Sequence, residues 1–199
     1  MSTTNEQTLQ SYSDAAQKYV DLSPNMLTES QERLLFEAFG DFDYGELIVE
    51  IGSGSGRDAL YLQDHGKTVL ATDAVASFLD ILTLKGLNNK FLNILEEEVP
   101  FCRGVLANAV FLHFTTAELR VALKNIRSGL DYGGVLAFTV KEGYDEFFTT
   151  EKIGLPRFFK LWREHEILAL LTDSGFVVDS FVRDVAGDTV WLQVIARKV

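Results

Sequence analysis

The sequence predicts one α/β domain with a doubly wound sheet of seven strands, parallel except for the last strand. Three observations lead to this fold class. From residue 46 onward, short apolar runs alternate with amphipathic helical patterns, which is typical of βαβ units around a parallel sheet. The run at 47–51 is rich in β-branched residues and lies between two glycines, as in a strand buried on both faces. The last two apolar runs, 176–182 and 189–196, are too close together for a parallel crossover, so they must form an antiparallel pair.

The other elements follow from the two hydrophobic periodicities, alternation for strands and a 3.6-residue repeat for helices. Further strands are expected at 67–72, 90–94, 103–110 and 134–140, and helices at 55–65, 75–85, 116–128 and 163–174.

Ahead of the sheet, the amphipathic stretch 6–39 predicts two helices that are separated near Ser23 and Pro24. We expect Pro24 in the first turn of the second helix, because its missing N–H would have no partner at that position.

The charge of the chain excludes several classes of function. Its 199 residues include 29 acidic and 18 basic side chains, a formal net charge of −11, and the pI is near 4.7. Nucleic-acid binding domains gain affinity from clustered lysine and arginine, so we expect no nucleic-acid partner. Residues 1–50 carry ten acidic and two basic residues, a net −8, and the other 149 residues carry 19 and 16, a net −3. The acidity therefore belongs mainly to the helical segment before the sheet.

The chain has one cysteine, Cys102, which cannot form an internal disulfide, and its first ten residues lack the basic and apolar regions of a secretory signal. No uncharged apolar run approaches the roughly 18 residues that span a bilayer. We expect a cytoplasmic protein without a membrane partner. The run of three acids at 96–98 is expected to be a solvated loop, and no metal site is predicted.

A glycine-rich turn is the most informative motif. Gly52, Gly54 and Gly56 lie where the strand at 47–51 gives way to a helix, and glycine there lets a ligand approach the main chain without a Cβ in the way. Asp73 ends the next strand, about 20 residues on, where an acid can accept hydrogen bonds from ribose hydroxyls. Together they predict a nucleoside site.

The spacing and charge of this motif indicate which nucleoside is bound. A dinucleotide site uses G-x-G-x-x-G to place a pyrophosphate at the helix start, whereas this loop reads G-x-G-x-G. Glu50 precedes the loop by two positions, and its carboxylate would repel a pyrophosphate but favour an amino or sulfonium group. A cationic nucleoside fits better, while a nicotinamide or flavin site and a purely structural turn stay open.

The motif E-I-G-S-G-S-G, followed by A-T-D, resembles motif I and the second-strand acid of class I S-adenosylmethionine-dependent methyltransferases, which have a Rossmann-like sheet. The resemblance extends over nearly the whole chain. Tyr12, Ala16 and Tyr19 resemble the lid helix of small bacterial members, 107–113 resembles the end of their fourth strand, and 133–143 resembles the fifth strand and its exit.

The resemblance implies a cofactor, S-adenosyl-L-methionine, and a role for each matching residue. The lid would be 1–45, the cofactor-binding core 46–140, an acceptor-side insertion 141–163, and the C-terminal helix and strand pair 164–199. The implied cofactor-binding residues are Tyr12, Tyr19, Glu50, Gly52, Gly54, Gly56, Asp73, Ala74, Asn93 and Asn108. Leu95 or Asn93 stands where the family usually has the acid that binds the adenine amino group after the third strand, and Asn93 could accept through its amide oxygen.

Candidates on the acceptor side are fewer. His113 follows the fourth strand, where it would act as a general base or simply pack the next helix. The stretch 152–163 has four basic residues and no acid, which suggests that Arg157, Phe158 and Trp162 line a pocket for an anionic acceptor or form an ordinary basic surface. Tyr12 and Tyr19, likewise, would either close over the cofactor or only pack the first helix on the domain.

The predicted function is methyl transfer from S-adenosylmethionine to a small-molecule acceptor. One alternative is a non-catalytic domain that binds or senses S-adenosylmethionine. A second alternative, which the glycine loop fits less well, is an NAD-dependent oxidoreductase. Neither the acceptor nor the oligomeric state can be inferred from the sequence.

Overall fold

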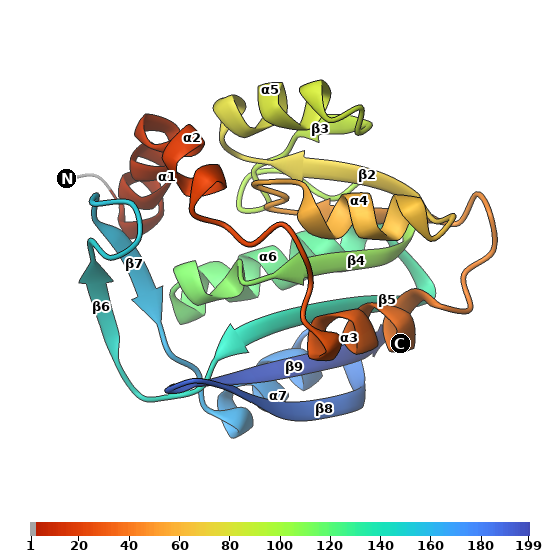
Figure 1. Ribbon diagram of the computed structural model, residues 1–199. Coiled ribbons are helices and arrows are strands. Elements are labelled where there is room, and N and C mark those ends of the chain that lie inside the picture. Colours follow the sequence, from red (N-terminus) through yellow and green to blue (C-terminus); the bar gives the residue numbers. More distant parts are fainter. Residues whose placement is uncertain (1–2) are drawn as a thin grey trace.

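The computed structural model describes residues 3–199, so the first two residues of the predicted lid lie outside it (Figure 1). Seven strands form one sheet in the order β3-β2-β1-β4-β5-β9-β8, and β9 alone runs in the direction opposite to the other six. Their bounds are β1 Leu47–Ile51, β2 Thr68–Asp73, β3 Asn89–Phe91, β4 Cys102–Asn108, β5 Leu130–Lys141, β8 Phe176–Ala186 and β9 Thr189–Lys198. The predicted fold class is confirmed.

Helices cover both faces of the sheet (Figure 1). The helices are α1 Thr4–Asp14, α2 Ala16–Asp21, α3 Glu29–Phe39, α4 Arg57–Asp64, α5 Ala76–Leu84, α6 Thr116–Gly129 and α7 Glu164–Asp173, with a 3-10 turn, η1, at Phe111–His113. A separate hairpin consists of β6 Glu146–Thr149 and β7 Arg157–Lys160.

The two cores follow from strand alternation. In β1, Ile48 points to the layer of α3, α4 and α5, and Val49 points to the layer of α6 and α7. The same alternation holds for Val105 and Leu106 in β4, because successive side chains of a strand face opposite ways. Both faces of the central strands are therefore buried, as the continuous apolar runs predict.

The N-terminal prediction needs correction. Residues 3–39 form three helices instead of two, and Pro24 lies outside all of them. The third helix begins at Glu29 because Thr28 caps it: the Thr28 hydroxyl accepts from the Gln31 N–H at 3.3 Å, and the Gln31 side chain accepts from the Thr28 N–H at 3.0 Å. This capping box satisfies two N–H groups at the start of α3 that have no partner within the helix.

Other element boundaries differ more modestly. The third strand ends at Phe91 instead of residue 94, and the fourth ends at Asn108 because residues 111–113 turn into η1. The hairpin β6–β7 inside segment 141–163 has no counterpart in the predicted elements. The two strands of this hairpin pair with each other and do not join the main sheet. Their hydrophobic pattern therefore reflects contact with α1 and not a place in the core of a sheet.

Trp162 was expected to line an acceptor pocket, and this is wrong. Its side chain is fully buried, and its indole N–H donates to the Phe111 carbonyl at 3.1 Å. Trp162 belongs to the core between β5 and α7. Its role is therefore packing. Over residues 3–199, none of the helices has the length and apolar character needed to cross a membrane.

Replacing Trp162 by alanine should lower the free energy of unfolding by about 3–5 kcal/mol, because it removes a large buried side chain and leaves a cavity. Denaturant unfolding followed by circular dichroism measures this loss. Tyr132→Ala, at a side chain that is 76% exposed, is the control and should stay within about 0.5 kcal/mol of the wild type. An equal, small effect of both substitutions would contradict the assignment of Trp162 to the core.

Candidate functional site

The glycine loop between β1 and α4 forms one wall of the site. Gly52, Gly54 and Gly56 have φ angles of +66°, +48° and +76°, which side chains with a Cβ rarely adopt. A Cβ on Gly52 would lie 2.7 Å from Val110 Cγ2, and one on Gly54 would lie 3.3 Å from the Tyr19 ring. The sequence places glycines here because both the backbone turn and the close neighbours require them.

Asp73, at the end of β2, fixes this loop. One carboxylate oxygen accepts from the Gly54 N–H at 2.9 Å and the other from the Val75 N–H at 2.9 Å. Burial raises the pKa of this carboxyl to about 6, and the hydrogen bonds from Gly54, Val75 and Ala74 oppose the rise. A carboxylate has about four acceptor positions, so lone pairs remain for a diol in the adjoining cavity.

A small cavity of about 100 Å³ adjoins Asp73. Most of the predicted cofactor-binding residues border it, from the carboxyl ends of β1, β2 and β4 and from the lid helices: Tyr12, Tyr19, Gly52, Gly54, Asp73, Ala74, Asn93 and Asn108. Tyr12, Tyr19 and Phe78 cover the cavity as an aromatic cluster, with ring centroids 5.2–6.0 Å apart. The cavity is therefore a small, partly open and mostly apolar slot with an acid among its lining residues.

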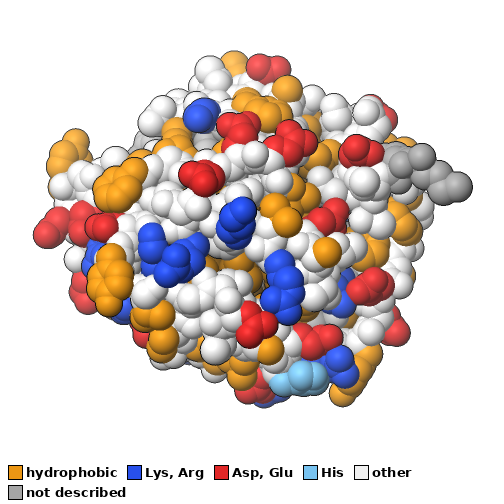
Figure 2. All heavy atoms as spheres, turned by 180° about the vertical axis from the view of Figure 1, so that it is seen from behind, with side chains coloured by type: hydrophobic (Ala, Val, Ile, Leu, Met, Phe, Trp, Pro, Cys, Tyr) orange, Lys and Arg blue, Asp and Glu red, His pale blue; other side chains and the backbone are white. Residues whose placement is uncertain are grey.

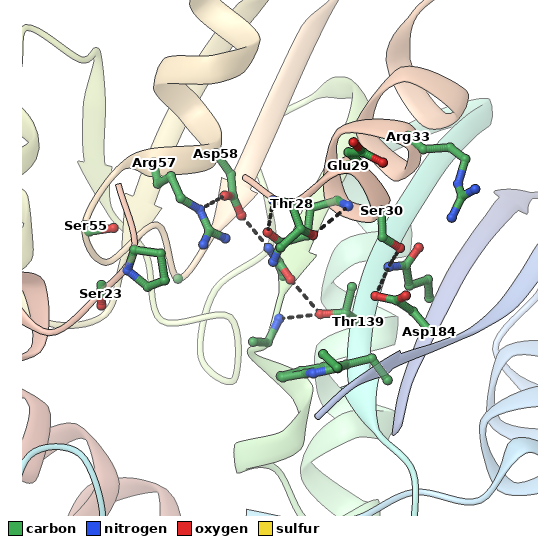
Figure 3. Close-up of a pocket in the computed structure, with 18 of the residues that line it drawn as sticks. Ser23, Thr28, Glu29, Ser30, Arg33, Ser55, Arg57, Asp58, Thr139 and Asp184 are labelled. Atoms are coloured by element: carbon green, nitrogen blue, oxygen red, sulfur yellow. Dashed lines mark hydrogen bonds and ion pairs between the residues drawn. The ribbon is translucent and has the colours of Figure 1, made fainter. Parts of the chain in front are cut away.

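A larger pocket of about 690 Å³ lies beside the slot (Figure 3). It extends from the glycine loop, over the ends of β4 and β5, to the start of α3 and the β8–β9 hairpin. Both cavities are bordered by the same four residues, Tyr19, Gly52, Asn108 and Ala109. A ligand that fills the slot would thus present one end to the large pocket at this junction.

Two buried acids lie on the pocket side of the glycine loop. Burial raises the pKa of Glu50 to about 8, and the negative charge of Asp58 adds to the rise. The Glu50 Oε2 atom is buried without a hydrogen-bond partner among the described residues. An unpaired buried oxygen is costly, and a cationic or N–H group of a ligand in the pocket would remove that cost.

Asp58 anchors a hydrogen-bonded chain across the junction (Figure 3). It accepts from Arg57 at 2.7 Å and from the Asn108 amide at 2.6 Å. The Asn108 oxygen in turn accepts from the Thr139 hydroxyl at 2.6 Å, which itself accepts from the Ala109 N–H at 2.9 Å. The chain holds the end of β4 in place, where Ala109 has a positive φ of 56°.

His113 takes part in a second chain, between the lid and the hairpin. Its Nδ1 lies 2.7 Å from the Phe158 carbonyl and must donate, so its Nε2, 2.9 Å from the Tyr12 hydroxyl, accepts. Burial lowers the pKa of His113 to about 4. Both ring nitrogens of this neutral histidine are engaged, which favours the packing interpretation of His113 over the general-base interpretation.

Arg157 lies at the far end of this chain, and its expected place in an acceptor pocket is not observed. It is buried, donating to the Tyr12 hydroxyl at 3.0 Å and to the Glu151 carbonyl at 2.7 Å. Phe158 is also buried, and its N–H donates to Thr8 of α1 at 3.0 Å. Neither residue borders the large pocket. The basic stretch therefore holds the lid against the hairpin.

Sequence reasoning missed the residues that line the acceptor half of the large pocket. Lys152 enters it from the β6–β7 connection, and Gln193, Asp184 and Trp191 enter it from the last hairpin. Asp58 stands directly after the glycine loop, and that position could have drawn attention to it. The others carry no local pattern, because they converge only when β8 and β9 fold back beside β5.

The fold and the site define a nucleoside-binding α/β protein. Residues 49–138 match the family model described as "Methyltransferase domain". This match bears out the resemblance to class I S-adenosylmethionine-dependent methyltransferases that the sequence motifs predict. No curated protein matches the chain in sequence.

Solved structures share this fold at low sequence identity. A magnesium protoporphyrin IX methyltransferase from Synechocystis PCC 6803, crystallised with S-adenosylmethionine, has a TM-score of 0.78 at 14% identity and covers 100% of this chain and 99% of that one. A 1,6-didemethyltoxoflavin-N1-methyltransferase from Burkholderia thailandensis has a TM-score of 0.73 at 20% identity, covering 98% and 87%. A methyltransferase from Methanosarcina mazei has a TM-score of 0.72 at 18% identity, covering 87% and 99%.

The raised pKa of Glu50 predicts how stability depends on pH. The unfolded-state pKa is about 4.3 and the folded value is about 8, so between them the folded protein holds a proton that the unfolded chain has lost. The unfolding free energy of the ligand-free protein should then fall as pH rises through this window. Glu50→Gln cannot lose that proton, so its stability advantage over the wild type should grow from pH 5 to pH 8.

Thermal unfolding at several pH values measures this effect. Glu37→Gln, on the exposed face of α3, removes the same charge and serves as the control. A Glu50→Gln curve that runs parallel to both the wild-type and control curves would contradict the buried, protonated Glu50.

Arg157→Met should weaken binding of S-adenosylhomocysteine by roughly threefold to tenfold, because it removes a charged donor that holds the lid residue Tyr12. Isothermal titration calorimetry measures the affinity. Tyr12→Phe removes the same hydrogen bonds from the other side and should have a similar effect, whereas Arg157→Lys should be intermediate. Unchanged cofactor affinity together with a raised Michaelis constant for an acceptor would restore the acceptor role of Arg157.

Proposed function

We propose that this methyltransferase transfers the methyl group of S-adenosylmethionine to a small-molecule acceptor bound in the 690 Å³ pocket. The single observation that carries the proposal is the junction of the two cavities at Tyr19, Gly52, Asn108 and Ala109. A nucleoside in the slot would direct its sulfonium end to this junction. An acceptor in the large pocket would reach the same point from the other side.

The residues of the slot fit the cofactor. The glycine loop is a cradle that a Cβ would fill, and Asp73 would accept from the ribose hydroxyls with its free lone pairs. Glu50 Oε2, buried and unpaired, would face the methionine amine, whose positive charge would favour the ionised carboxylate. Asn108 would offer its backbone carbonyl to the same amine, and Ala74 and Asn93 would border the adenine.

The lid would close the site from above. Tyr12, Tyr19 and Phe78 cover the slot, and aromatic rings both exclude water and pack well against a purine or a sulfonium. Closure of the lid would thus strengthen the electrostatic interactions inside the site.

The mechanism relies on positioning. When bound, S-adenosylmethionine supplies an activated methyl group, and the attacking atom of the acceptor must lie in line with the bond that breaks. The Asp58–Asn108–Thr139 chain fixes the strand ends that hold both partners, and alignment of this kind accounts for several kcal/mol of a barrier. His113 has both nitrogens occupied, so the proposal assigns no general base.

The large pocket supports the proposal that the acceptor is a small molecule. Its volume lies within the range of about 300–1,000 Å³ that small-molecule sites have. Over the face shown in Figure 2, acidic and basic side chains are interspersed, without a continuous basic stripe such as nucleic-acid binding requires. We propose a small molecule, and the basic side chains of the pocket favour one with an anionic group.

A binding protein without catalysis is the second candidate, since the site assigns no base. The large pocket at the methyl end argues against it, because a sensor has no need of space for a second substrate. An NAD-dependent oxidoreductase is disfavoured by the unpaired Glu50 beside the loop.

The test compares ligands and turnover. S-adenosylmethionine, and not NAD, should raise the melting temperature of the wild type, and S-adenosylhomocysteine should be released with some members of a panel of small acceptors. Asp73→Ala should abolish the shift. Asp80→Ala, at an acid of α5 outside both cavities, is the control and should retain it. Binding with no release from any acceptor would favour the sensor, and a shift with NAD alone would contradict the proposal.

A further inference from the structure

Lys152 is the one basic side chain of the acceptor-side insertion that borders the large pocket. Its Nζ lies 3.9 Å from the centre of the Tyr19 ring and donates to the Ser23 hydroxyl at 2.9 Å. Tyr19 in turn packs on Gly54 of the glycine loop. Lys152 therefore sits where the lid, the insertion and the loop meet.

The backbone of Lys152 is strained. Its φ of 67° is positive, and among the non-glycine residues of 3–199 only Ala109 shares this property. Both residues border the large pocket. A left-handed conformation is unfavourable for a residue with a long side chain, and such strain concentrates at functional sites. Here it turns the ammonium group toward the pocket.

A second cation completes the corner. Arg57 borders the same pocket (Figure 3) and is near enough to lower the pKa of Lys152, together with burial and Arg157. Only the Nε atom of Arg57 is engaged, with Asp58. Within the part of the chain that the structure describes, its terminal nitrogens have no hydrogen-bond partner and Lys152 has no carboxylate within ion-pair distance. Two neighbouring positive charges thus face the pocket with donors to spare.

We propose that Lys152 and Arg57 form a binding corner for a carboxylate group in the large pocket. The inference rests on the proposed function, because the carboxylate belongs to a ligand of that site. It has two possible sources: the methionine end of the cofactor, which would lie over Gly54, or an acidic acceptor.

The chemistry of the corner favours a carboxylate over a phosphate. Arg57 presents the paired N–H groups that match two carboxylate oxygens, and Lys152 adds a point charge. Asp58 and Glu29 border the same pocket, so a doubly charged group would meet more repulsion than a singly charged one.

Lys152→Met removes the charge at similar length, and Lys152→Arg retains it. The matched control is Lys124→Met, on the exposed face of α6. For the cofactor, calorimetry compares S-adenosylhomocysteine with 5′-methylthioadenosine, which lacks the carboxylate. For the acceptor, ligand-observed NMR compares benzoate with benzyl alcohol on protein saturated with S-adenosylhomocysteine.

If the cofactor supplies the carboxylate, Lys152→Met should weaken S-adenosylhomocysteine roughly tenfold and leave 5′-methylthioadenosine unchanged. If the acceptor supplies it, the wild type should prefer benzoate to benzyl alcohol, and Lys152→Met should lose that preference. In either case Lys152→Arg should restore most of the effect. If Lys152→Met matches the wild type in both experiments, the inference is wrong. A wild type that binds neither nucleoside would instead contradict the proposed function.

Discussion

The contact between Asp73 and the glycine loop is the constraint on which the site depends. The 2.9 Å hydrogen bond from the Gly54 N–H to this carboxylate ties the turn after β1 to the end of β2. It keeps three consecutive glycines of the G-x-G-x-G pattern in left-handed conformations, and it places an acid at the floor of the slot. Because β1 lies inside the sheet and pairs with both β2 and β4, the loop has a rigid support. The nucleoside site is thus a direct consequence of two neighbouring parallel strands that end at the same edge.

The lid is held by the acceptor side of the molecule, and this couples the two halves of the site. The α1 helix has more contact with β7 than with any element of the cofactor core, and the hydrogen bonds between them run through Thr8, Tyr12, Arg157 and His113. These groups are buried and polar, and their hydrogen bonds to one another stabilise the contact, while the Nε atom of Arg157 has no partner among the described residues. Movement of the hairpin would therefore disturb the rings that cover the slot, and a ligand that orders one half would favour order in the other.

Charge inside the site differs from charge on the chain as a whole. The net charge of −11 resides mainly in the N-terminal helices, while the large pocket brings Glu50, Asp58, Arg57 and Lys152 close together. Burial keeps Glu50 protonated near neutral pH, which reduces the negative charge that the empty site carries. A zwitterionic group, with one amine and one carboxylate, matches this arrangement because both acidic and basic side chains border the pocket.

The sequence by itself determined the fold class, the antiparallel last strand, and the glycine loop with Asp73 at the end of the next strand. These features are local: glycine positions, an acid at a strand end and hydrophobic periodicity are all readable along the chain. It predicted the start of α3 wrongly, because the capping box at Thr28 competes with Pro24 and local signals do not rank the two. Only the tertiary structure decided the acceptor half. Arg157 and Trp162 have the residue types of a binding site but are buried against α1 and the core, whereas Lys152 and Gln193 reach the pocket. The roles of these residues depend on how segments more than a hundred residues apart pack together. Such long-range packing produces no hydrophobic periodicity that can be recognised in the sequence.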